Sequence, residues 1–86
     1  MKTIYKYSIN DSVPVPEHFK VLTAAFQGGD PYIWIELDPN REAKMQVQFS
    51  IFGTGGELPE NPGIYLNTVF QNEFVWHIYY QVVPIE

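Results

Sequence analysis

The residues best suited to chemistry lie in the glycine-rich stretch Gly53-Thr54-Gly55-Gly56, which directly follows a run of alternating apolar residues. Glycine lets the backbone approach an anion closely, and successive backbone N–H groups can form a concave nest for a phosphate. A dinucleotide site or a P-loop needs a helix after its glycines, but two prolines and no apolar periodicity follow here. The stretch therefore predicts either a plain turn or a phosphate nest built without a helix, with Thr54, Gly55 and Gly56 as ligand-binding residues.

Other side chains with catalytic or metal-binding chemistry are few. His18 and His77 are the two histidines, far apart in the sequence, and cysteine is absent. No H-x-H or HExxH spacing is present, so we expect no metal site and no thiol catalysis. Glu36 and Asp38 share one face of a predicted strand, as an acid–base pair requires, but Asp38 precedes Pro39 and starts a turn. The sequence therefore predicts no enzyme, no metal ligands and no cofactor.

Aromatic side chains are more numerous than a small core needs, with two Trp, six Tyr and six Phe. Rings on a sheet face can stack with bases, or they can pack in an interface between subunits. Both interpretations stay open. The candidate ligand-binding side chains outside the loop are Trp76, His77, Tyr79, Tyr7 and Trp34, with Arg41 to meet a phosphate.

Alternation of apolar and polar residues predicts the strands that must position these side chains. It is clearest over residues 44–52, 64–71 and 74–82. A short first strand over residues 2–8 and two strands that flank the turn Gly28–Pro31 complete the pattern. The residues assigned to one face of each of the last three strands are Met45, Val47, Phe49 and Ile51; Ile64, Leu66 and Phe70; and Phe74, Trp76, Ile78, Tyr80 and Val82.

We therefore predict a single domain over residues 1–86, all-β, with about six antiparallel strands in a compact small sheet, a sandwich or an open barrel, and no substantial helix. Residues 9–18 are expected to be a loop that crosses between strands. The second long loop covers residues 53–62. Long loops in compact domains often have a function, so we expect Gly53–Pro59 to border a ligand pocket.

Composition limits the partners. Ten acidic residues against five basic ones give a formal net charge of -5, which argues against DNA or RNA binding. Hydrophobic residues make up 45% of the 86 residues and charged residues 17%, so we expect self-association into a dimer or a tetramer. The first residues do not form a signal peptide, and no run approaches the roughly 20 apolar residues of a membrane span, so no membrane association is expected.

Four segments resemble a family of small phage proteins of unknown function: the opening "MKTIYKY", the central "GGDPYIWIELDP", the loop "FGTGGELP" and the closing "FVWHIYY". The resemblance covers nearly the whole chain. It implies a phage origin, action in the bacterial host cytoplasm, and kinship with sponge proteins that counter CBASS-type immunity. Such proteins are oligomers that sequester cyclic nucleotides without cleaving them. The implied ligand is a cyclic dinucleotide such as 3'3'-cyclic GMP-AMP.

An alternative is an acidic inhibitor that mimics nucleic acid and blocks a basic host nuclease or restriction factor. This alternative requires a contiguous acidic face. A virion structural role is a third possibility. The carboxylates that would form the acidic face are Glu36, Asp38, Glu42, Glu57, Glu60 and Glu73.

Overall fold

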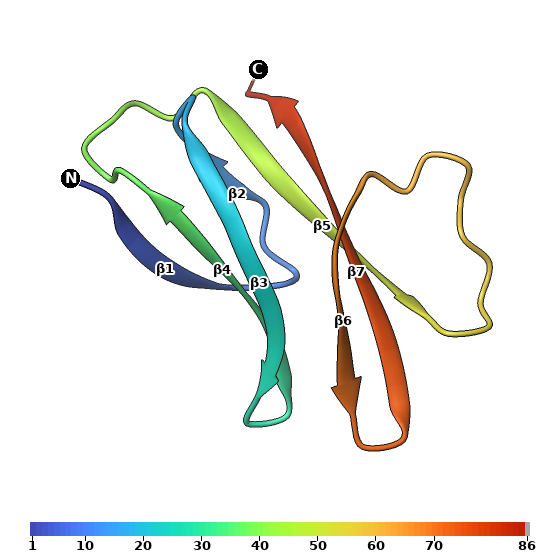
Figure 1. The fold of residues 1–86 in the computed structure, drawn as a ribbon. Helices are drawn as coiled ribbons and strands as arrows, with labels where there is room; N and C mark the ends of the chain where they lie inside the picture. Colours follow the sequence, from blue (N-terminus) through green and yellow to red (C-terminus); the bar gives the residue numbers. More distant parts are fainter. Residues whose placement is uncertain (86) are drawn as a thin grey trace.

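The computed structural model describes residues 1–85, and they fold into seven β-strands (Figure 1). All pairings between strands are antiparallel. No helix lies in residues 1–85, and hence none in that range is long and apolar enough to span a membrane. The strands are β1 (Thr3–Ser8), β2 (Val13–Val15), β3 (Phe19–Gln27), β4 (Asp30–Leu37), β5 (Met45–Gly53), β6 (Ile64–Gln71) and β7 (Phe74–Pro84).

The strands form two sheets, one with the order β1-β4-β3 and one with the order β2-β5-β7-β6. In Figure 1 the three-stranded sheet and the four-stranded sheet lie against each other, with the β3–β4 and β6–β7 hairpins at the same end. The all-β antiparallel prediction is confirmed, and the two sheets do not close into a barrel.

The expected loop over residues 9–18 contains a strand that the sequence analysis missed. Val13 and Val15 are buried on either side of the exposed Pro14, and the three residues pair with β5. Three residues with a central proline give too short an alternation to recognise. Proline is tolerated here because β2 is an edge strand, where an N–H on the outer side has no partner to lose.

The core lies between the two sheets and consists of aliphatic side chains. β4 contributes a strict alternation, with Ile33, Ile35 and Leu37 buried. β4 lies in the centre of its sheet and is paired with β1 on one side and β3 on the other. The buried hydrophobic residues are Ile9, Val13, Val15, Ala24, Ile33, Ile35, Leu37, Val47, Val69 and Ile78.

One assigned face was wrong after the middle of β6. Phe70 was placed with Ile64 and Leu66, but Phe70 is 69% exposed and its neighbour Val69 is buried. The cause is a β-bulge between Tyr65 and Asn67, which moves every later residue of β6 to the opposite face. The faces assigned within β5 and β7 hold, since Val47 and Ile78 are fully buried.

The bulge turns Asn67 toward β3, where it joins the edges of the two sheets. Its side-chain nitrogen donates to the Ala24 carbonyl oxygen at 2.9 Å and to the Thr23 hydroxyl at 3.1 Å. Its Oδ1 atom is buried and has no hydrogen-bond partner within residues 1–85. The β3 and β6 edges are therefore tied together by a side chain rather than by a backbone ladder.

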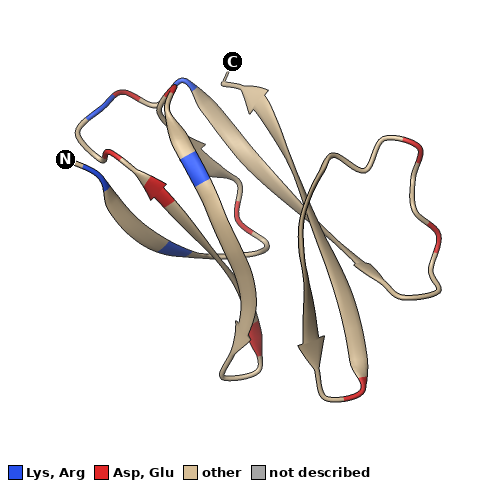
Figure 2. Cartoon of the chain, in the orientation of Figure 1, with Lys and Arg blue, Asp and Glu red and all other residues tan. Residues whose placement is uncertain are grey.

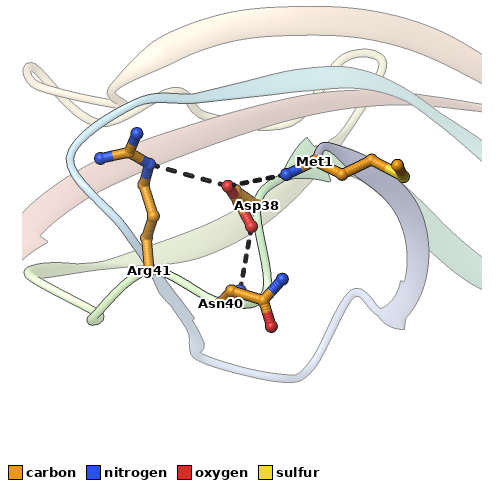
Figure 3. A network of polar contacts seen from close by, with 4 residues as sticks. All are labelled: Met1, Asp38, Asn40 and Arg41. Carbon is orange, nitrogen blue, oxygen red and sulfur yellow. Dashed lines mark hydrogen bonds and ion pairs between the residues drawn. The ribbon is translucent and has the colours of Figure 1, made fainter.

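The turn after β4 is organised by Asp38 (Figure 3). Its Oδ1 accepts the Asn40 backbone N–H at 3.0 Å, and its Oδ2 accepts the Met1 amino group at 3.1 Å. The Arg41 Nε lies 3.7 Å from Oδ2, and the Arg41 N–H donates to the Asp38 carbonyl at 3.2 Å. The Asn40 N–H, followed by the hydrogen bond and charge of the amino terminus and by the Arg41 charge, lowers the pKa of the Asp38 carboxyl.

This network predicts an acid-sensitive contribution to stability. Because the folded state lowers the pKa of Asp38, the stabilisation is complete above the ordinary value of 3.8 and is lost as the pH falls through the lower folded value. We expect Asp38→Asn to weaken the fold at about pH 7 and to lose less stability than wild type between about pH 5 and pH 2. Urea unfolding across that range tests this, and an Asp38 titration midpoint at or above 3.8 by NMR would contradict it.

Candidate functional site

A surface pocket of about 300 Å³ lies where β5 ends, beside the outer face of β7. The β5–β7 register places Phe52 opposite His77 and Gly53 opposite Trp76, so the loop that follows β5 starts near the beginning of β7. The pocket is lined by Phe52, Gly53, Thr54, Gly55, Gly56, Leu58, His77 and Tyr79. Five residues that the sequence analysis named separately therefore meet in one place: Thr54, Gly55, Gly56, His77 and Tyr79.

His77 is held on both ring nitrogens by threonine hydroxyls. Its Nε2 lies 2.7 Å from the Thr54 Oγ1, and its Nδ1 lies 3.0 Å from the Thr68 Oγ1. The Thr68 hydroxyl in turn lies 2.7 Å from the Tyr65 hydroxyl, and the Thr54 hydroxyl lies 3.3 Å from the Val75 carbonyl oxygen. A continuous hydrogen-bonded chain thus runs from Tyr65 to Val75 and fixes the plane of the imidazole.

Which groups donate and which accept along this series of hydrogen bonds depends on the histidine tautomer. With the proton on Nε2, His77 donates to Thr54, and Thr54 donates to Val75. With the proton on Nδ1, Thr54 donates to His77, and His77 donates to Thr68. In both states the Thr54 proton is used within the protein, so Thr54 donates to a ligand only with the His77 proton on Nε2 and in place of its 3.3 Å bond to the Val75 carbonyl oxygen.

The loop backbone offers fewer free donors than the glycine content predicts. The Gly56 N–H donates to the Gly53 carbonyl at 3.1 Å, and the Thr54 N–H donates to the Val75 carbonyl at 3.1 Å. Gly55 has a φ of +87°, as expected for a nest, and no hydrogen bond from its N–H is found within residues 1–85. In this loop conformation the Gly55 amide, and not the Gly56 amide, is free for a ligand.

Three aromatic side chains lie in a row across the outer face of the four-stranded sheet, beside the pocket. Tyr79 contacts Phe52 on one side, with ring centroids 5.6 Å apart at 77°, and Tyr65 on the other, at 5.5 Å and 68°. Tyr65 is 53% exposed. Phe52, Tyr65 and Thr68 were not foreseen as site residues. Finding Tyr65 and Thr68 from the sequence requires the strand register and the position of the β6 bulge.

Trp76 lies on the opposite face from His77, because successive residues of a strand alternate. Its ring packs toward the core below Gly53, where a Cβ would lie only 3.2 Å from the indole Cζ3. It stacks with Phe74 at 6.0 Å and 24°, and its Nε1 donates to Gln71 Oε1 at 3.2 Å. The structure therefore does not bring Trp76 to the pocket.

Tyr7 and Trp34 belong to the three-stranded sheet and are also absent from the pocket lining. Tyr7 packs against the core, and burial, followed by the nearby Tyr5, raises the pKa of its hydroxyl. Trp34 pairs with Lys6 across β4 and β1, and its ring lies 6.5 Å from that of Tyr32.

Arg41 lines a different pocket, of about 330 Å³, at the end of the molecule where β3 begins. Cations and carboxylates alternate in that pocket, and the Lys44 amino group pairs with Glu42 at 3.2 Å. Its charge is therefore close to balanced, which makes it a poor phosphate site. Its lining consists of Pro16, Glu17, His18, Arg41, Glu42 and Lys44.

The carboxylates proposed for an acidic face come from strand β4 and from separate turns and loops (Figure 2). Asp38 is engaged by the amino terminus and Arg41. Glu36 lies opposite Lys20 in the register of β3 and β4. Glu57 and Glu60 lie in the β5–β6 loop, and Glu73 lies in the β6–β7 turn. Within residues 1–85 no group of three or more His, Asp or Glu is arranged to hold a metal ion.

The fold and the pocket define the class: a small two-sheet β-protein with a surface pocket of aromatic, glycine and hydroxyl groups beside a long loop. The chain belongs to the family described as a domain of unknown function (DUF7352), whose model matches residues 1–86. No curated protein and no solved structure matches the chain.

Proposed function

We propose that this protein binds and sequesters a cyclic dinucleotide such as 3'3'-cyclic GMP-AMP, in the manner of a phage protein that counters CBASS-type immunity in the bacterial host cytoplasm. The phage origin and the ligand class rest on the sequence resemblance. The observation that supports a binding site is that the glycine loop and the outer residues of β7 line one pocket. Thr54, His77 and Tyr79 there offer a hydroxyl, an imidazole and a ring to the same ligand.

The pocket suits one nucleotide. Its volume of about 300 Å³ is at the lower end of small-molecule sites. A base would stack on Tyr79 or Phe52, at about 1–3 kcal/mol per base, while the Thr54 hydroxyl and the Gly55 N–H donate to a phosphate. The other half of a dinucleotide would extend over the exposed ring of Tyr65.

Calorimetry against a panel of cyclic dinucleotides tests this proposal. We expect one ligand to bind and to be recovered intact by mass spectrometry. Recovery of the intact ligand distinguishes binding from cleavage. This distinction is needed because the Thr54 hydroxyl lies 2.7 Å from His77 Nε2, which is also the geometry of a nucleophile and its general base. Cleaved ligand would overturn sequestration, and no heat across the panel would overturn nucleotide binding. A stoichiometric host protein captured instead would favour the acidic inhibitor.

Replacing Thr54 by valine keeps the shape and removes one hydroxyl. We expect binding to weaken by about 1–3 kcal/mol, because a hydrogen bond to a charged phosphate is lost and His77 Nε2 loses its partner. Glu60→Gln is the control, since Glu60 lies in the same loop but outside the pocket lining, and its affinity should be unchanged or slightly higher. Equal affinities for Thr54→Val and wild type, with both proteins folded, would remove Thr54 from the site.

A further inference from the structure

The sheets end in four edge strands, and three of them are protected. β3 and β6 face each other and are tied by the hydrogen bond from Asn67 to Ala24. β2 has three residues and a central proline, Pro14. The fourth edge, β1, has six residues, no proline and no bulge, and within residues 1–85 no strand pairs with its outer side. Such an edge is a template for another strand.

The side chains of β1 leave this edge open. Ile4 is 56% exposed on the outer face, and Tyr5 is 37% exposed on the face that looks toward the core. A lysine on an edge strand usually blocks pairing. Here Lys6 is directed across its own sheet, because its Nζ donates to Gln27 Oε1 at 2.8 Å and lies 4.5 Å above the Tyr32 ring.

We propose that β1 pairs antiparallel with β1 of a second copy of the chain around a two-fold axis, which makes one six-stranded sheet with the order β3-β4-β1-β1-β4-β3. The axis passes between the two Tyr5 residues. Thr3 then lies opposite Tyr7 of the second copy, and Ile4 lies opposite Lys6. Core-facing residues meet core-facing residues, as a continuous sheet requires.

The charges of β1 select this register. Keeping the faces aligned restricts a slip to steps of two residues. A slip in one direction places Lys6 opposite Lys6 of the second copy, and a slip in the other places Lys2 opposite Lys6. Like charges directly opposite each other are destabilising. The register centred on Tyr5 has no facing lysines and places the apolar side chain of Ile4 against the Lys6 stem.

This interface involves no residue of the Thr54–His77–Tyr79 pocket. The dimer and nucleotide binding can therefore be tested separately, and the dimer is tested without any nucleotide.

Cysteine cross-linking tests the register directly, because the chain has no cysteine of its own. Tyr5→Cys should form a disulfide-linked dimer under mild oxidation, since residues opposite each other in an antiparallel pair have Cβ atoms about 4.5–5.5 Å apart. Ile4→Cys alone and Lys6→Cys alone should cross-link poorly, and a mixture of the two should cross-link efficiently. Efficient cross-linking of Lys6→Cys to itself, with no product between the two different variants in the mixture, would overturn this register.

Light scattering tests the interface with a matched pair of variants. Wild type should have twice the monomer mass at about 100 µM. Ile4→Lys should be monomeric, because it places a lysine opposite Lys6. Ile64→Lys should remain dimeric, since Ile64 is equally exposed, at 55%, on the β6 edge. Monomeric wild type, or dissociation caused by Ile64→Lys but not by Ile4→Lys in proteins with unchanged circular dichroism, would overturn the proposal.

Discussion

Gly63→Ala should lower the free energy of unfolding by about 2–5 kcal/mol, which combines the cost of a left-handed residue with that of overpacking. Gly63 has a φ of +98°, and a Cβ there would lie 2.5 Å from the Tyr80 carbonyl oxygen and 2.8 Å from the Gln81 Cγ. The Tyr80 backbone cannot easily retreat. It belongs to β7, where Tyr80 pairs with Phe49 of β5 on one side and with Ile64 of β6 on the other.

Two other glycines separate the effect of φ from that of the collision. Gly29 has a φ of +90° and Gly55 a φ of +87°, and a Cβ at either position would meet nothing within 4 Å. Gly29→Ala and Gly55→Ala should therefore cost only about 1–2 kcal/mol. Urea unfolding of the three variants measures the difference. A Gly63→Ala protein as stable as Gly29→Ala would show that β7 can shift to admit the methyl group.

Ile35→Ala should lower the free energy of unfolding by about 2–5 kcal/mol, the range found for large-to-small substitutions in cores. Ile35 is fully buried in β4, between β1 and β3, and its neighbours along the core face, Ile33 and Leu37, are buried as well. Strands paired on both sides cannot collapse easily into the cavity. In a domain of 86 residues this loss is a large part of the total stability.

Ile64→Ala is the matched control for the core prediction. Ile64 is the same residue type in a strand but is 55% exposed, so its truncation should change stability by about 0.5 kcal/mol or less. Guanidinium unfolding measures both losses. Comparing how steeply the free energy of unfolding falls with denaturant concentration in each variant distinguishes a change in stability from a change in the unfolded state. Similar losses for the two variants would contradict a core centred on β4.

Alternation predicted the fold class and the faces of β5 and β7 because both strands run without interruption across the core. It failed in β6, where the bulge after Tyr65 reverses the faces and buries Val69 in place of Phe70. It also missed β2, since three residues around Pro14 are too short to show a period. A bulge is fixed by what a strand pairs with, and the pairing partner is not visible in the strand's own residues.

The candidate site was predicted only in part, because its assembly also depends on which strands pair with each other. The loop residue Thr54 and the strand residue His77 were named from their chemistry, and the β5–β7 register brings them to 2.7 Å. The period of two already places Trp76 on the opposite face of β7 from His77, so the sequence itself separates these two side chains. The separation of Arg41 from the pocket was not, because it depends on how the two sheets and their loops are arranged in space.

The sheet order also sets the sequence of events during synthesis. β1, β3 and β4 are complete by Leu37, so the three-stranded sheet can form while the rest of the chain is still being translated. β7 is the last strand, yet it lies between β5 and β6, which have no ladder with each other. Until residues 74–84 leave the ribosome, the strand that pairs with both β5 and β6 is missing. Val47 and Val69 are not yet buried in a complete core at that stage. The second sheet therefore forms only once β7 is available, in a step governed by the long-range pairing of β7, and the nascent chain exposes the β5 and β6 edges until then.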